Sequence, residues 1–322
     1  MRLLRGLHNL HLAQAELQHG CVLTIGNFDG VHLGHGAILQ QVHTLATQLG
    51  LPSVVMVFEP LPIEYFSPES APVRLMNLRE KLAAFQQTDV DFVLVCRFEA
   101  EFASWSAQDF VQRLLVERLK VRHLVVGDDF RFGHQRQGDF GFLSEQGHRL
   151  GFEVTDVTTY EVDAARVSST RVREALAVHD LALAKRLLGK SFCFHGRVIH
   201  GQKLGRKIGF RTLNLNPKRL QMPLEGVYAV KVTGLAATDW PGVANIGVRP
   251  TVKGQRPSIE VHLFDWDKDV YGAHIGVRIE RFIRPEMTFD SLAALTHQIR
   301  QDAQAARQML TMAEPTVRPA PQ

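Results

Sequence analysis

The stretch Thr24–His35 reads TIGNFDGVHLGH, and it decides the fold of the first half of the chain. The apolar run Cys21–Ile25 predicts a buried strand, and apolar residues then recur at helical spacing over residues 38–49. Gly50 predicts the end of that helix, and Ser53–Phe58 is strand-like again. The order of strand, glycine turn, helix and strand predicts a βαβ unit whose first turn opens onto a helix N-terminus.

The glycine turn suits an anionic ligand. The first N–H groups of a helix lack intrahelical partners and the helix dipole is positive there, so phosphate oxygens can bind. Gly26, Gly30 and Gly34 allow the backbone to approach a phosphate closely. His32 and His35 lie three positions apart, so both imidazoles can face the same phosphates and stabilise a transferring group. Packing histidines or a His-x-x-His metal pair are the alternatives, but no nearby cysteine cluster completes a metal site.

The same residues resemble a known family. His-x-Gly-His after a strand is similar to the signature of the nucleotidyltransferase superfamily, and GNFDGVHLGH at residues 26–35 resembles the bacterial bifunctional riboflavin kinase/FAD synthetase family. The resemblance implies an α/β Rossmann-like first domain that adenylylates FMN with ATP. It also implies ATP contacts from Gly26, Asn27, Phe28, Asp29 and Gly34, with His32 and His35 catalytic.

Length and composition predict a two-domain globular protein. The chain has 322 residues, of which 45% are hydrophobic and 22% charged. Its first residues lack the apolar core of a signal peptide, and no run of about 18 apolar residues occurs. The three cysteines are scattered in apolar contexts, which is typical of buried thiols. We therefore expect a cytoplasmic protein with no membrane partner.

The charge is divided unevenly along the chain. Residues 1–183 hold 16 Lys and Arg against 22 Asp and Glu, whereas residues 184–322 hold 21 against 11. A basic second half suits a domain that handles phosphates, although a merely solvated basic surface has the same composition. No clustered basic run occurs, so we expect no nucleic-acid partner.

Three later loops of the first half extend the predicted site. In open α/β sheets ligands bind beyond the carboxyl ends of the strands, where the Pro-rich loop Phe58–Pro62 should lie. Gly127–Gly133 follows the strand His123–Val126, and its Asp129 could hold adenine, ribose or a metal-bound water, or could cap a turn. Ser168, Ser169 and Thr170 can cap the next helix, and with Arg171 they could form a second anion site.

These loops resemble the FEPxP, GxDFxFG and SSTxIR segments of the same family. The resemblance implies ATP contacts from Asp129, Ser168, Ser169 and Thr170, and a catalytic role for Arg171. An ordinary turn remains the alternative for the Pro-rich loop.

The second half changes periodicity from helical to strand-like. Short runs broken by Gly and Pro predict an antiparallel sheet or barrel, closed by one helix, Ser291–Met312. We place the domains at residues 1–183 and 184–313, with a short entry segment at residues 1–20 and a disordered tail at residues 314–322. The predicted strands of the second half are Phe192–Ile199, Gly226–Thr233, Gly242–Ile246, Ser258–Phe264 and Gly276–Ile283.

Residues 201–215 combine glycines and cations, which suits a phosphate-cradling loop, although a basic surface turn is the alternative. Thr212 and Asn214 offer oxygen ligands to Mg²⁺. The segment resembles the GxxxGFPTAN motif of riboflavin kinases, but Arg211 replaces Pro and Leu213 replaces Ala. Arg211 could add a phosphate contact or crowd the site. The resemblance implies that Thr212 and Asn214 bind the metal, and that ATP is bound by Gly201, Lys203, Gly205, Arg206, Gly209, Thr212 and Asn214.

Two more segments of the second half resemble the family. Ala244–Thr251 contains NIGxRPT, whose Gly and Pro predict a turn. In Ile259–Trp266 the alternation puts Glu260 and His262 on one face of a strand. A carboxylate there can accept the proton of a hydroxyl that attacks ATP, although strand-edge glutamates are often only solvated. The resemblance implies that Glu260 is the general base.

Taken together, the resemblance implies an antiparallel β-barrel riboflavin kinase domain with a C-terminal helix. The chain would convert riboflavin to FMN and FMN to FAD, with ATP as co-substrate and Mg²⁺ as cofactor. One alternative is an adenylyltransferase alone, whose kinase domain is impaired by Arg211 and Leu213. A non-enzymatic flavin-binding or nucleic-acid-binding module is the other, and the phosphate-site motifs argue against it.

Overall fold

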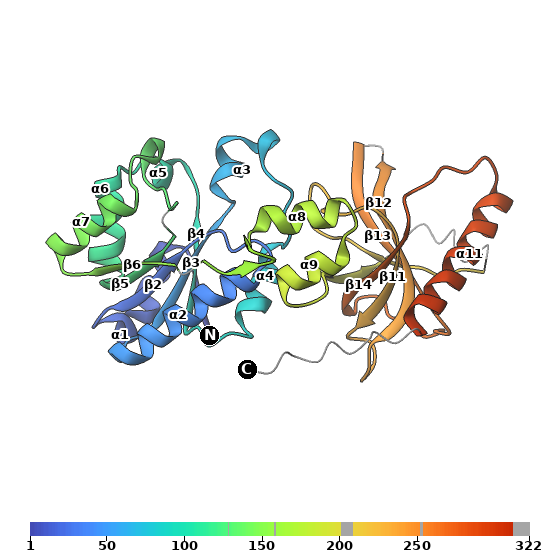
Figure 1. Ribbon diagram of the computed structural model, residues 1–322, viewed down its shortest axis with the longest axis horizontal. Coiled ribbons are helices and arrows are strands. Elements are labelled where there is room, and N and C mark those ends of the chain that lie inside the picture. Colours follow the sequence, from blue (N-terminus) through green and yellow to red (C-terminus); the bar gives the residue numbers. More distant parts are fainter. Residues whose placement is uncertain (128, 158, 201–208, 252–253, 312–322) are drawn as a thin grey trace. The chain divides into compact units, whose positions relative to one another are not determined.

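The computed structural model describes residues 1–127, 129–157, 159–200, 209–251 and 254–311 (Figure 1). The chain forms two compact units. The first contains residues 1–72 and 76–169, and the second contains residues 73–75 and the chain from Thr170 onward. The sequence-based boundary near residue 184 remains a prediction.

The first unit is built on a six-stranded sheet in which every neighbouring pair is parallel, in the order β1-β4-β3-β2-β5-β6. The parallel α/β fold is thereby confirmed. Residues 1–20 are more than an entry segment, because β1 pairs with β4 and buries Leu4. The strands are β1 (Arg2–Arg5), β2 (Cys21–Ile25), β3 (Ser53–Glu59), β4 (Phe92–Arg97), β5 (Val121–Val126) and β6 (Glu153–Asp156).

Helices cover both faces of this sheet, which explains why its central strands are apolar throughout (Figure 1). On one face, Leu23, Met56 and Leu124 pack in a cluster with η3 and α7. On the other face, valines of β2–β5 pack against α2 and α4. The α-helices are α1 (Gln14–Leu17), α2 (Leu33–Leu49), α3 (Pro62–Phe66), α4 (Leu78–Phe85), α5 (Ala100–Ala103), α6 (Ala107–Asp109) and α7 (Phe140–Leu150). The 3₁₀-helices are η1 (Leu7–Ala13), η2 (Pro68–Ser70) and η4 (His134–Arg136), and η3 (Phe110–Arg118) is π-helical. A separate pair of short strands is formed by β7 (Glu161–Val162) and β8 (Ala165–Arg166).

The second unit contains a closed antiparallel barrel with the strand order β10-β13-β12-β11-β14-β9. The predicted barrel is confirmed, but β10 lies in a segment expected to be a loop, and β12 is longer than predicted. The elements are α8 (Ser169–Ala177, which begins at the last residue of the first unit), α9 (Leu181–Leu188), β9 (Cys193–Ile199), β10 (Leu213–Leu215), β11 (Gly226–Thr233), β12 (Trp240–Thr251), β13 (Gly254–Leu263), β14 (His274–Arg284) and α11 (Leu292–Thr311).

Strand register separates the inside of the barrel from its outside. Leu213 and Leu215 pair with Val261 and Ile259, and all four are buried, as expected for the filled interior of a small barrel. Residues of the opposite parity face outward. On β11 and β12 that outer face is covered by α11, whose Ala303 and Ala306 share a cluster with Val227, Ala229 and Val243 (Figure 1).

A buried ion pair ties α11 to the barrel. The Arg284 guanidinium donates two hydrogen bonds to Asp302, at 2.9 and 2.7 Å, and the two side chains are 16% and 6% exposed. Gln298 donates to the same carboxylate at 2.9 Å. Such bidentate pairing fixes the end of β14 against the helix.

Candidate active sites

The loop between β2 and α2 has an unusual backbone. Phe28 and Val31 adopt φ angles of 46° and 40°, and Gly30 has a φ of 88°. Residues other than glycine rarely adopt this left-handed conformation, and it persists where surrounding contacts hold the backbone. The loop is therefore a shaped feature of the first unit.

Three contacts hold the loop in that shape. The Lys81 ammonium of α4 donates to the carbonyl of Asn27 at 2.5 Å. The Asp29 carboxylate accepts from the N–H of Met76 at 2.9 Å, and the carbonyl of Asp29 accepts from the Ser169 hydroxyl at 2.8 Å. Asp29 is only 3% exposed, so its carboxylate holds the loop from the interior of the unit. Lys81 was not identified from the sequence, because one lysine in a helical pattern carries no signal of its own.

His32 and His35 come together at the start of α2, as their spacing predicts. The N–H of His35 donates to His32 Nδ1 at 3.2 Å, so His32 is the N-cap of the helix. The two rings stack with centroids 3.6 Å apart and planes 14° apart. Gly34 makes this packing possible, because a Cβ there would lie 3.2 Å from both His32 Nδ1 and the carbonyl of Val167.

The pair is arranged as neutral imidazoles. His32 Nδ1 accepts a hydrogen bond, which leaves the proton of that ring on Nε2. Burial lowers the pKa of His35 well below its ordinary value, and the repulsion that a protonated His32 or the Lys81 ammonium exerts on a second positive charge lowers it further. Neutral rings of this kind can donate hydrogen bonds to phosphate oxygens without taking up a proton first.

Backbone donors surround the same point. Within the described residues, the N–H groups of Phe28, Gly30 and Val31 have no hydrogen-bond acceptor, and the first N–H groups of α2 lie beside them. Successive free N–H groups at a helix start form an anion-binding concavity. The Nδ1 atom of His35 is also buried without a partner. The geometry fits phosphate groups in the place that the sequence predicted.

The other residues predicted for this site are less clearly associated with the loop between β2 and α2. Asp129 is exposed, and its carboxylate lies 3.8 Å from the Arg166 guanidinium. Ser168 is half-buried, and Ser169 holds the loop as described above. Thr170 and Arg171 belong to α8 in the second compact unit. Their contacts with ATP remain predictions.

An aromatic cavity of ≈ 510 Å³ lies in the first unit, at the carboxyl end of β3. Its wall combines side chains from three separate stretches of the chain, residues 58–66, 98–110 and 130–136, which is why no single stretch of sequence revealed it. The basic residues Arg131, His134 and Arg136 also line it. Aromatic members of the wall are Phe58, Phe66, Phe98, Phe102, Trp105, Phe110, Phe130 and Phe132.

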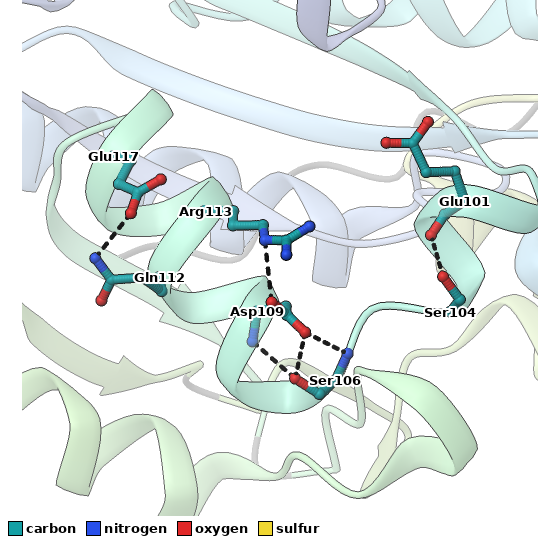
Figure 2. A network of polar contacts seen from close by, with 7 residues as sticks. All are labelled: Glu101, Ser104, Ser106, Asp109, Gln112, Arg113 and Glu117. Atoms are coloured by element: carbon teal, nitrogen blue, oxygen red, sulfur yellow. Dashed lines mark hydrogen bonds and ion pairs between the residues drawn. The ribbon is translucent and has the colours of Figure 1, made fainter.

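A polar network fixes the part of this wall that precedes η3 (Figure 2). The Ser106 hydroxyl donates to the Asp109 carboxylate at 2.7 Å and accepts from the N–H of Asp109 at 3.0 Å. Arg113 forms an ion pair with the same carboxylate at 3.0 Å. This capping box sets the start of the helix, and hence the positions of Trp105 and Phe110 on either side of it.

A larger cavity of ≈ 700 Å³ in the same unit is lined by η1, α5 and the end of η3. It contains none of the residues predicted to bind ATP, and its wall carries both cations and carboxylates. The smaller aromatic cavity is the better match to a planar organic ligand.

The outer face of the barrel carries the predicted residues of the second site. Glu260 of β13 pairs in register with Asn214 of β10 on one side and with Asn245 of β12 on the other. Residues paired directly across antiparallel strands project from the same face, with Cα atoms about 4.5–5.5 Å apart. The three polar side chains therefore form one row, outside the filled interior.

Asn214 has the properties of a ligand that lacks its partner. The residue is buried, and its Oδ1 atom has no hydrogen-bond partner. Thr212 precedes it by two residues and is partly exposed. Amide and hydroxyl oxygens of this kind fit Mg²⁺, which takes few protein ligands and several from water or phosphate.

The predicted ATP loop of the second site is only partly described. Four of its predicted residues lie outside the described part of the chain: Gly201, Lys203, Gly205 and Arg206. Gly209 adopts a φ of 82°.

Arg211, which replaces a proline of the family motif, is directed at a neighbouring loop. Its guanidinium donates to the carbonyl of Asp267 at 2.7 Å and lies 3.8 Å from the Asp269 carboxylate. His262 Nδ1 donates to the carbonyl of Arg211 at 2.9 Å. The substitution thus ties the β10 segment to the loop after β13.

The NIGxRPT segment does not form the predicted turn at its glycine. Asn245 and Gly247 both lie within β12, where they face the same side. Asn245 Nδ2 donates to Glu286 at 2.9 Å, and the Glu286 carboxyl group covers Gly247, where a Cβ would lie 2.2 Å from it. Glu286, which the sequence did not reveal, is thereby placed beside the row that contains Glu260.

Comparisons with known proteins match the two halves of the chain to two protein families. Residues 14–171 match the family model of FAD synthetase, and residues 188–310 match that of riboflavin kinase. The bifunctional riboflavin kinase/FMN adenylyltransferase of Escherichia coli K12 is 50% identical over 315 residues, covering 98% of this chain and all of the relative. The Pseudomonas fluorescens protein of the same name is 50% identical over 308 residues, covering 95% and 97%.

A crystal structure from Streptococcus pneumoniae has a similar fold, with a TM-score of 0.76 at 27% identity over 95% of this chain and 99% of the other. That protein is described as a macrolide-efflux protein. In the part of this chain that the structure describes, every helix is too short or too polar to cross a membrane.

Proposed function

The chain belongs to the family of bifunctional riboflavin kinase/FMN adenylyltransferases, and we propose which of its side chains carry the two reactions. The enzyme phosphorylates riboflavin to FMN and adenylylates FMN to FAD. The observation that carries the proposal is the position of the two family matches: one contains the stacked histidines, and the other contains the row of Asn214 and Glu260.

In the adenylyl transfer, a phosphate oxygen of FMN attacks the α-phosphorus of ATP, and the bond to the departing pyrophosphate breaks. His32 and His35 donate hydrogen bonds to the phosphates, as do the free N–H groups of the loop, so that charge is stabilised where it develops. Arg171, Ser168, Ser169 and Thr170 are proposed to hold the remaining phosphates, and Asp129 the nucleoside. No covalent enzyme intermediate is needed.

The aromatic cavity is proposed to hold the isoalloxazine ring of FMN. Flat rings stack on Phe and Trp side chains, and the cavity follows β3, which neighbours β2 in the sheet. The carboxyl ends of adjacent parallel strands lie at one edge, so ring and phosphate of one FMN can be bound together there.

In the kinase reaction, the terminal hydroxyl of riboflavin attacks the γ-phosphorus of ATP and ADP leaves. Glu260 is proposed to accept the hydroxyl proton, because its carboxylate lies on the open face beside Asn214. Thr212 and Asn214 would hold Mg²⁺, which supplies charge neutralisation at the phosphates when bound. The direction of Arg211 toward Asp267 supports a working kinase over an adenylyltransferase alone.

The experiment is a product assay. Purified protein is incubated with riboflavin, ATP and Mg²⁺, and riboflavin, FMN and FAD are separated over time. We expect FMN to appear first and FAD to follow. FAD from supplied FMN but no product from riboflavin would contradict the assignment of the second site, and FMN without FAD would contradict the first.

A cytoplasmic location is also proposed. It is supported by the three cysteines, which are all free, as in proteins of reducing compartments.

A further inference from the structure

Lys81 of α4 is buried in the first unit with only 1% of its surface exposed. Lysine is almost never fully buried unless a specific partner offsets the loss of hydration. Its position is set by α4, which starts with a capping box in which Asn77 and Glu80 bond each other's N–H groups, at 3.0 and 2.8 Å. The helix therefore presents the ammonium group at a fixed place.

The ammonium group lies against the loop between β2 and α2, which forms the first site. The ammonium donates to the carbonyl of Asn27 at 2.5 Å. In a trans peptide the carbonyl and the following N–H point in opposite directions, so drawing the Asn27 carbonyl toward Lys81 turns the N–H of Phe28 away from it. The N–H of Phe28 is one of the loop donors that lack an acceptor. The lysine thus sets the direction of a phosphate donor that it does not itself touch.

The same ammonium acts on the histidines through its charge. Its positive charge, together with burial and His32, lowers the pKa of His35. A fixed positive charge in a poorly hydrated place also favours anions nearby, because it is weakly screened there. Lys81 thereby favours a neutral His35 and an anionic ligand at the same point.

We propose that Lys81 is a positioning residue of the adenylyltransferase site, which orients the loop N–H groups toward the triphosphate and places a fixed positive charge near the histidine pair. The inference rests on the proposed function of the first site. It differs from that proposal because Lys81 makes no contact with the substrate.

The test compares Lys81→Met with Lys120→Met in the full-length protein. Lys120 is exposed in the same unit and also donates to a backbone carbonyl, that of Gln18, at 3.4 Å. FAD formation from FMN and ATP is measured across pH, and circular dichroism with thermal unfolding reports whether the first unit of each variant is folded. Riboflavin phosphorylation by the second unit serves as the reaction that should not change.

We expect Lys81→Met to lower kcat for FAD formation by about 10- to 100-fold, less than the roughly 10²- to 10³-fold for removal of a preorganised donor, because the donor is misdirected and not removed. The kinase should change little. The acid limb of its pH profile should move to higher pH, because His35 then takes up a proton more readily. Lys120→Met should change neither quantity.

Two results would overturn the inference: a folded Lys81→Met protein with normal FAD formation, or a loss of activity with an unmoved acid limb. If the first unit of Lys81→Met does not fold, Lys81→Gln replaces it, since the amide keeps a donor for Asn27 without the charge. An unmoved acid limb in that variant is equally contrary. Failure of the wild-type protein to make FAD from FMN would instead refute the proposed function itself.

Discussion

At the first site, the two imidazoles are held by different means. His32 is fixed through Nδ1 as a helix cap, whereas His35 is fixed by stacking against His32 and by its contact with Phe28, whose ring centroid is 4.9 Å away. The His32 ring cannot rotate far without breaking its hydrogen bond to the helix N-terminus, and the His35 ring is restrained by stacking against it. The pair is therefore preorganised, which is the condition under which hydrogen-bond donors contribute most to phosphoryl chemistry.

The lowered pKa of His35 predicts how stability responds to acid. The folded protein resists protonation of this ring, whereas the unfolded chain takes up the proton near the ordinary histidine pKa. Below about pH 6.5 this group therefore makes unfolding more favourable, by up to about 1.4 kcal/mol per pH unit. We expect His35→Gln to reduce the fall in Tm of the first unit between about pH 6.5 and 5. An unchanged pH slope in that variant would mean that His35 is protonated in the folded protein.

Among the site residues, the sequence revealed those that belong to recognisable motifs. It missed those that act through contacts with residues far away in the chain. His32, His35 and Asn214 stand in recognisable patterns; the structure brings the two histidines together, whereas Asn214 lies in β10, where a loop was expected. Lys81 and Glu286 act on the sites through Asn27 and Asn245, and such pairings arise only when separate segments fold together. The direction of Arg211 was equally hidden, because its partner, Asp267, lies 56 residues away.

At the scale of elements, β12 shows how a strand can shape a site without supplying the reacting group. Gly247 leaves room on the outer face, and Glu286 occupies that room while it accepts from Asn245. We expect Gly247→Ala to displace the Glu286 carboxylate, because a Cβ would lie 2.2 Å from it. A carboxylate beside Glu260 can accept hydrogen bonds from the hydroxyl groups of riboflavin, so the KM for riboflavin should rise by about tenfold.

Gly196→Ala is the matched control for this change. Gly196 is also in a barrel strand, and a Cβ there would meet its nearest atoms at 3.4 Å, which is ordinary contact. Steady-state kinetics of FMN formation would compare the two variants with Glu286→Gln. If Gly247→Ala and Glu286→Gln both keep the wild-type KM for riboflavin, Glu286 has no part in substrate binding.

The elements that were predicted well are those with enough residues to show a period. β3 and β11 follow the sequence pattern closely. In contrast, β1 and β10 have four and three residues, too few for alternation to show. Side-chain spacing alone also cannot reveal that η3 has π-type hydrogen bonds.

At the scale of the whole molecule, the chain joins two units that each have their own core. The parallel sheet of the first is buried on both faces, and the barrel of the second is filled by its own inward side chains. The change from helical to strand periodicity indicated two domains, and the opposite charge balance of residues 1–183 and 184–322 accompanies it, although the boundary near residue 184 remains a prediction. Because each core is local, damage to one site should leave the chemistry of the other intact.

This separation leads to a test with two complementary variants. Glu260→Gln should lower FMN formation by about 10²- to 10⁴-fold, as expected for loss of a general base, and should still make FAD from supplied FMN. His32→Ala with His35→Ala should accumulate FMN and make no FAD. Mixed in equal amounts with riboflavin and ATP, the two proteins should restore FAD after a lag, since FMN released by one chain can bind the intact first unit of the other. FMN without FAD in that mixture, although each variant keeps its own remaining reaction, would mean that FMN is not released from the chain that forms it.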